Sequence, residues 1–290
     1  MELCAWLALP VPAIALGVAV AAHHYVAMHA FAPNVAAMVL GVGGTLLFMR
    51  RTAAVQRTMA AWGAMAACLL VALTLLSPGI DGVHRWVRMG PIGLNASTVV
   101  SPLFLAATLG WLLRARGLPI VAVAAMLAMH VAQPDAAQCT ALGAACMVMV
   151  FSTPGLARWV RMVLLAVTLV MVSAAWMRAD PLTPVDHVEG IVRLAMSQGL
   201  GVAAAAWLAL GLLFLPMLRA LRQPKVEMRI LGLAFGLYLA AQIAMTFAGN
   251  FPVPVMGAGA GPVLGWYAML AALLAEPKAH PVPVAVASVT

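Results

Sequence analysis

The sequence has 290 residues, of which 65% are hydrophobic and only 8% are charged. A soluble domain carries about 25% charged residues, so these charges could not cover a folded surface in water, and lipid must be the main solvent. The formal net charge is +8, yet no basic patch with interleaved aromatic residues occurs, which argues against nucleic acid as a partner.

Apolar stretches follow one another along the whole chain, and each is a candidate transmembrane helix. We predict an all-α, polytopic membrane protein with about ten transmembrane helices, forming a single domain over residues 1–275. The stretches 118–132 and 136–153 could instead form one broken, re-entrant pair. The ten stretches are 3–22, 32–49, 59–77, 98–113, 118–132, 136–153, 162–177, 199–218, 230–248 and 258–275.

The positions of lysine and arginine orient these helices. With the N-terminus in the cytoplasm, the inside segments hold twelve of the 16 lysines and arginines, and the outside segments hold only Arg85, Arg88, Arg178 and Arg193. The positive-inside rule therefore favours a cytoplasmic location for both termini, and residues 276–290 are predicted to be a cytoplasmic, disordered tail. The two longest outside loops are 78–97 and 178–198, and long loops of this kind tend to carry function.

The first long outside loop contains Arg85, Trp86 and Arg88. Because the two arginines are three residues apart, a helical turn would place both guanidinium groups on one side. Paired guanidinium groups at the outer surface suit a phosphate or pyrophosphate, and Trp86 suits the headgroup level. The alternative is an interfacial helix whose arginines reach up to lipid headgroups.

Asp135 lies between two apolar stretches, directly after Gln133 and Pro134. A carboxylate in that position favours an N-cap for the stretch 136–153.

The second long outside loop places Asp186 and Glu189 on either side of His187, just before an apolar helix. A carboxylate at a membrane mouth is partly desolvated, which raises its pKa and makes it a better base. The alternative is a capping arrangement, with Asp186 at the helix N-terminus and Glu189 three residues further on. The last outside stretch, 249–257, is rich in Gly and Pro, and such backbone near membrane depth must be buried in protein or line a wet cavity.

These pieces, in this order, resemble the SEDS family, the RodA/FtsW/SpoVE proteins of bacterial cell-wall synthesis. Residues 82–91 (GVHRWVRMGP) are similar to the family's NGARRWIxLGP stretch, and residues 133–135 match its QPD motif. Ser97 closes the tripeptide that stands where the family has QPS. Residues 184–191 resemble the PxxHTDFI loop, with His187 at the His and Glu189 at the Asp, and residues 251–261 resemble the GIPLPFxSYGGSS end.

The resemblance implies a glycosyltransferase that polymerises lipid II at the outer face of the bacterial cytoplasmic membrane, in cell division or cell-shape maintenance. Its implied partners are a class B penicillin-binding protein and membrane lipids. Glu189 would deprotonate the acceptor hydroxyl, and Arg85 and Arg88 would hold the donor pyrophosphate. The resemblance also implies a divalent cation as a candidate cofactor. Further expected substrate-binding residues are Trp86, Ser97, Asp135 and His187.

Three departures from the family pattern keep other functions open. Glu189 is longer than aspartate by one methylene, about 1.5 Å of reach, and Thr98 and Ser101 stand where the family has Glu and Lys. A non-catalytic partner or scaffold in a division or elongation complex is therefore the alternative. A transporter of lipid-linked precursor is a weaker one, because no charged residue lies at the centre of a predicted span.

Overall fold

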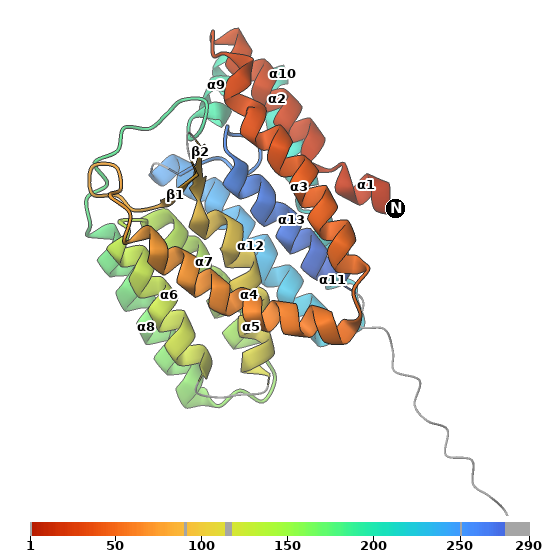
Figure 1. Ribbon diagram of the computed structural model, residues 1–290, viewed down its shortest axis with the longest axis vertical. Helices are drawn as coiled ribbons and strands as arrows, with labels where there is room; N and C mark the ends of the chain where they lie inside the picture. The colour runs from red at the N-terminus through yellow and green to blue at the C-terminus, as the bar shows by residue number, and fades with distance from the viewer. Residues whose placement is uncertain (1, 90–91, 114–117, 250, 276–290) are drawn as a thin grey trace, which may run out of the picture.

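The computed structural model describes residues 2–89, 92–113, 118–249 and 251–275, and within these residues it is mostly helical (Figure 1). The first half contains α1 (Leu3–Leu7), α2 (Pro10–His23), the 3₁₀ helix η1 (Met28–Phe31), α3 (Ala32–Met49), α4 (Ala53–Thr74), β1 (Trp86–Met89), β2 (Ile92–Asn95), α5 (Ala96–Leu112) and α6 (Leu118–Ala132). The second half contains α7 (Ala136–Ser152), α8 (Arg158–Trp176), α9 (Ile191–Ser197), α10 (Leu200–Leu212), α11 (Leu215–Leu221), α12 (Val226–Ala248) and α13 (Ala260–Leu274).

Every predicted apolar stretch falls on helix, although two of them are broken. The stretch 3–22 divides into α1 and α2 just before Pro10, which cannot donate a backbone hydrogen bond and therefore favours the first turn of a new helix. The stretch 199–218 divides into α10 and α11, which are bent by 44°, and Pro216 lies in the first turn of the second helix. The predicted tail, 276–290, lies outside the described residues.

Helix length and apolar character identify which of these helices could cross a bilayer alone. Among the described residues, four helical stretches pass that test, and the bent pair α10–α11 would make a fifth. Five more apolar helices of 10–17 residues occupy the other predicted stretches, so the crossing count of about ten stays a prediction. The four long stretches are Leu3–His23, Met28–Met49, Arg158–Trp176 and Val226–Ala248.

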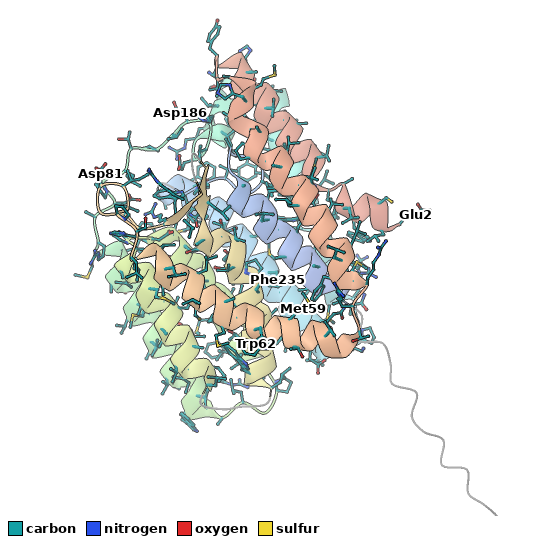
Figure 2. All side chains as sticks on the ribbon, viewed as in Figure 1. Glu2, Met59, Trp62, Asp81, Asp186 and Phe235 are labelled. Atoms are coloured by element: carbon teal, nitrogen blue, oxygen red, sulfur yellow. The ribbon has the colours of Figure 1, made fainter. Side chains whose placement is uncertain are left out.

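The outward faces of the helices are apolar, as a lipid-facing surface requires. Met59 and Trp62 project from α4 with 46% and 62% of their surfaces exposed (Figure 2). A helix in water would carry polar side chains on such a face.

Glycines let the central helices α5, α12 and α13 approach their neighbours closely. A Cβ atom added to Gly265 of α13 would lie 2.1 Å from the backbone oxygen of Thr98 in α5. A Cβ atom on Gly41 of α3 would collide with the ring of Tyr267 in α13. Such close contacts at small residues are typical of helix packing in membranes.

A two-stranded antiparallel hairpin lies between α4 and α5, at one end of the helix bundle (Figure 1). Its register runs from Trp86 opposite Asn95 to Met89 opposite Ile92. The helical turn that we expected for this loop is therefore wrong, and the alternative of an interfacial helix is wrong with it. Aromatic and β-branched residues such as Trp86 and Val87 favour an extended backbone, and here that preference prevails.

Candidate functional site

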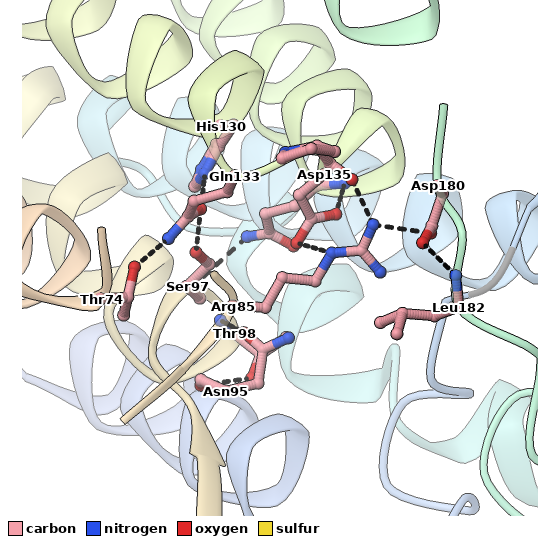
Figure 3. A network of polar contacts seen from close by, with 12 residues as sticks. Thr74, Arg85, Asn95, Ser97, Thr98, His130, Gln133, Asp135, Asp180 and Leu182 are labelled. Atoms are coloured by element: carbon pink, nitrogen blue, oxygen red, sulfur yellow. Dashed lines mark hydrogen bonds and ion pairs between the residues drawn. The ribbon is translucent and has the colours of Figure 1, made fainter. Parts of the chain in front are cut away.

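Arg85, the residue before β1, lies at the centre of a buried ionic cluster (Figure 3). Its Nη2 donates to Oδ2 of Asp180 at 2.7 Å and to the backbone oxygen of Pro134, and its Nε lies 3.4 Å from Oδ2 of Asp135. The guanidinium therefore joins three segments, namely the hairpin, the start of α7 and the loop that follows α8.

Asp135 has the N-cap position that the sequence predicts. Its Oδ1 accepts the backbone N–H of Gln138 at 3.1 Å, and the residue is buried. Its second oxygen faces Arg85, so one carboxylate both caps α7 and neutralises the guanidinium.

Buried amide side chains continue the polar network into the bundle. Gln133 accepts a hydrogen bond from the Ser97 hydroxyl at 3.3 Å and contacts Nδ1 of His130 at 2.9 Å. Gln138 donates to Oγ of Ser101 at 2.7 Å and to the Tyr238 hydroxyl at 2.6 Å. Ser97, expected to bind substrate, is thus buried inside this network.

Glu189 belongs to a tight turn that precedes α9. Its Oε2 accepts the backbone N–H of Val185 at 2.7 Å, while the N–H groups of Val188 and Glu189 donate to the Val185 oxygen. The capping alternative is wrong, because α9 has Gly190 at its N-cap and no side-chain cap, and Glu189 instead closes the preceding turn onto Val185. The loop is fixed to the Gly/Pro-rich segment, because Val253 and Ala258 donate to the backbone oxygens of Val188 and His187.

A pocket of about 250 Å³ opens beside this turn and brings three of the predicted residues together, namely Arg85, Trp86 and Glu189. Its remaining lining residues are Ile80, Asn95, Leu182, Thr183, Val185, Phe251 and Pro252. The hairpin, the loop after α8 and the segment before α13 therefore all contribute to one concave site.

The other predicted residues do not line this pocket. Arg88 lies on the opposite side of the extended chain from Arg85, because side chains three positions apart on a strand face opposite ways, and it is exposed. The structure therefore does not bring the Arg85 and Arg88 side chains together, and their joint role in binding a pyrophosphate stays a prediction. His187 is half-buried and is held through its backbone oxygen.

The electrostatic setting of the pocket suits a base. Burial raises the pKa of Glu189 above its ordinary value, although the backbone N–H groups and the nearby Arg85 oppose part of that rise. Burial would lower the pKa of Arg85, but the carboxylates of Asp135 and Asp180 raise it, so the guanidinium stays charged.

The divalent cation that the family resemblance implies stays a prediction. The described residues contain no group of three or more His, Cys, Asp and Glu side chains that could hold a metal ion. In the site, the carboxylates of Asp135 and Asp180 both pair with the Arg85 guanidinium (Figure 3).

Asp180 is the main residue that the sequence reasoning missed. It contacts Arg85 across 95 positions of chain, and no local spacing signals such a pair. Its acidic side chain at the exit of an apolar helix was the one available clue.

Residues 3–187 match the FtsW/RodA/SpoVE family model, described as a cell cycle protein. The match ends two residues before Glu189. No curated protein sequence matches the chain significantly.

Two solved structures share the fold. One is a chain from a peptidoglycan synthase complex studied for its coordination of polymerization and crosslinking, with a TM-score of 0.64, 20% identity, and coverage of 93% of this chain and 96% of that chain. The other is the crystal structure of the rod shape determining protein RodA from Thermus thermophilus, with a TM-score of 0.60, 19% identity, and coverage of 93% and 94%.

Proposed function

The chain belongs to the FtsW/RodA/SpoVE family of cell cycle proteins, the SEDS family, and from that premise we propose that it is a peptidoglycan glycosyltransferase. Its substrate is lipid II, a sugar carried on a polyprenyl pyrophosphate. It works at the outer face of the bacterial cytoplasmic membrane, in cell division or cell-shape maintenance.

The observation that carries this proposal is the shared pocket of Arg85 and Glu189. A polymerase needs a base for the acceptor hydroxyl and a positive charge near the donor phosphates. The half-buried, pKa-raised carboxylate of Glu189 suits the first role, and the guanidinium of Arg85 suits the second. Trp86 lines the same pocket and offers an aromatic wall.

The proposal includes a transmembrane topology. The ten apolar helical stretches cross it about ten times as one domain over residues 1–275, with both termini and the tail 276–290 in the cytoplasm. The pocket then opens at the outer face, where four of the 16 Lys and Arg residues lie. A class B penicillin-binding protein would be its partner and would crosslink the glycan chains that the polymerase makes.

Purified full-length protein tests the proposal directly. We expect labelled lipid II to be converted to glycan chains, Glu189→Gln to abolish conversion, and Glu189→Asp to retain a measurable part of it because a carboxylate remains. Full conversion by the Glu189→Gln variant would contradict the role of Glu189 as the base.

One observation favours a second candidate, a non-catalytic partner in the same complex. Asp135 and Asp180 already neutralise Arg85, and the Glu189 carboxylate already holds its own turn. Normal growth of cells carrying Glu189→Ala, together with loss of growth when the Gly265 packing contact is disrupted, would favour this scaffold over the polymerase.

A further inference from the structure

The Arg85 cluster consists of the Arg85 guanidinium and the carboxylates of Asp135 and Asp180, and the two carboxylates differ in their exposure to solvent. The Asp135 side chain is 1% exposed and is fixed at the start of α7, whereas the Asp180 side chain is 24% exposed. Asp180 lies in the loop between α8 and α9, in a stretch without helix or strand, and its Oδ1 accepts the N–H of Leu182 at 3.2 Å. Asp135 is therefore the permanent partner of the guanidinium, and Asp180 is the one that solvent can reach.

The two carboxylates also approach the guanidinium at different atoms. Asp135 faces Nε at 3.4 Å, while Asp180 takes Nη2 at 2.7 Å, and Figure 3 shows the two on opposite sides of the group. Arg85 lines the pocket with Leu182 and Glu189. The short charge-assisted contact to Asp180 thus engages the same side chain that the pocket presents to a ligand.

We propose that Asp180 is a placeholder anion, which pairs with Arg85 while the pocket is empty and gives up Nη2 to a phosphate of the bound substrate. A phosphate oxygen accepts the same N–H bonds as a carboxylate, so the exchange leaves no buried donor without a partner. Asp180 is the partly exposed member of the pair, so water can solvate its carboxylate after the exchange, which then costs less than breaking a fully buried pair. The proposal rests on the proposed function, which supplies the pyrophosphate.

Asp180 would then be a positioning residue, and the effect of its loss on ligand affinity distinguishes it from a structural anchor. A structural anchor supports the site, so its loss weakens ligand binding. A placeholder competes with the ligand, so its loss strengthens binding.

Asp180→Asn removes the charge at nearly constant shape, and Asp180→Glu keeps the charge. Asp81→Asn is the matched control, because Asp81 is an exposed residue of the loop that leads into the hairpin and loses the same charge (Figure 2).

The experiment is titration calorimetry of full-length protein in detergent with inorganic pyrophosphate, at fixed ionic strength. We expect Asp180→Asn to bind about three- to tenfold more tightly than the wild type, in line with the modest strength of a partly exposed ion pair. Asp180→Glu should bind like the wild type, and Asp81→Asn should change affinity by less than about twofold. The KM for lipid II should fall in Asp180→Asn by a similar factor.

Unchanged or weaker pyrophosphate binding by Asp180→Asn overturns the inference, as does equal tightening in Asp81→Asn, which would show a general charge effect. Absence of binding to Asp180→Asn overturns it as well. These outcomes are separable from failure of the proposed function, because the titration needs no turnover. Tighter pyrophosphate binding without any polymerisation would support Asp180 as a placeholder and contradict the proposed polymerase activity.

Discussion

Asp135 illustrates, at the scale of one residue, how a single carboxylate serves two structural purposes. It caps α7 and it pairs with the buried Arg85 guanidinium. We expect Asp135→Ala to destabilise the protein by about 2–4 kcal/mol, because the buried guanidinium loses one of its two carboxylates and α7 loses its cap. Asp135→Asn keeps the cap and should cost about 1 kcal/mol less. Thermal unfolding in detergent measures both variants, and equal losses would show that the cap contributes nothing.

Glu189 sets the expected pH dependence of the activity. Burial raises its pKa, and the base must be ionised, so polymerisation should fall as the pH decreases through a value above the ordinary glutamate pKa of about 4.3. The contribution of Glu189 to folding stability depends on pH in the opposite direction. The raised pKa favours the protonated folded state, so this contribution is present at low pH and is lost as the pH rises through the raised value. A pH–rate profile whose acid limb lies at or below the ordinary value would contradict this assignment.

What the sequence could predict at this scale was local. The Asp135 cap follows from a carboxylate three residues before the N–H that it accepts, whereas the cap predicted for Asp186 does not form and Glu189 closes a turn over four residues instead. The Arg85–Asp180 pair joins residues 95 positions apart, so it depends on how α8 packs, which no spacing encodes.

Among the elements, the contact between α5 and α13 depends on one glycine. A Cβ atom at Gly265 would lie 2.1 Å from a backbone oxygen that cannot move aside, so we expect Gly265→Ala to destabilise the protein by about 1–3 kcal/mol. Gly43→Ala in α3 is the control, because no atom lies within 4 Å of its added Cβ and alanine favours helix. Thermal unfolding in detergent compares the two, and an equal effect would mean that close packing at Gly265 is unimportant.

The helices were predictable because long apolar runs have few alternatives in lipid, where every backbone group must be paired internally. The hairpin was not, because Arg85 and Arg88 have helical spacing while their neighbours favour strand. The extended backbone separates the two guanidinium groups, so Arg85 lines the pocket and Arg88 does not. The proline at position 10 indicates the helix break, whereas apolar content alone does not.

On the scale of the whole molecule, the family and the pocket fit one orientation in the membrane. The hairpin, the Glu189 turn and the segment before α13 meet at one end of the bundle, and the transmembrane topology that we propose from the loop charges would place that end outside. Lipid II polymerisation at the outer face requires this orientation, so the functional account depends on it.

The most direct test is therefore the side of the membrane on which the pocket lies. In a Cys4→Ser background, the variants Asp186→Cys and Arg222→Cys place a thiol at two exposed positions, one beside the Glu189 turn and one in the loop before α12. On intact spheroplasts, a membrane-impermeant maleimide should label the Asp186→Cys variant, and should label the Arg222→Cys variant only after permeabilisation. Protection of the first variant together with labelling of the second would place the pocket in the cytoplasm and contradict the account.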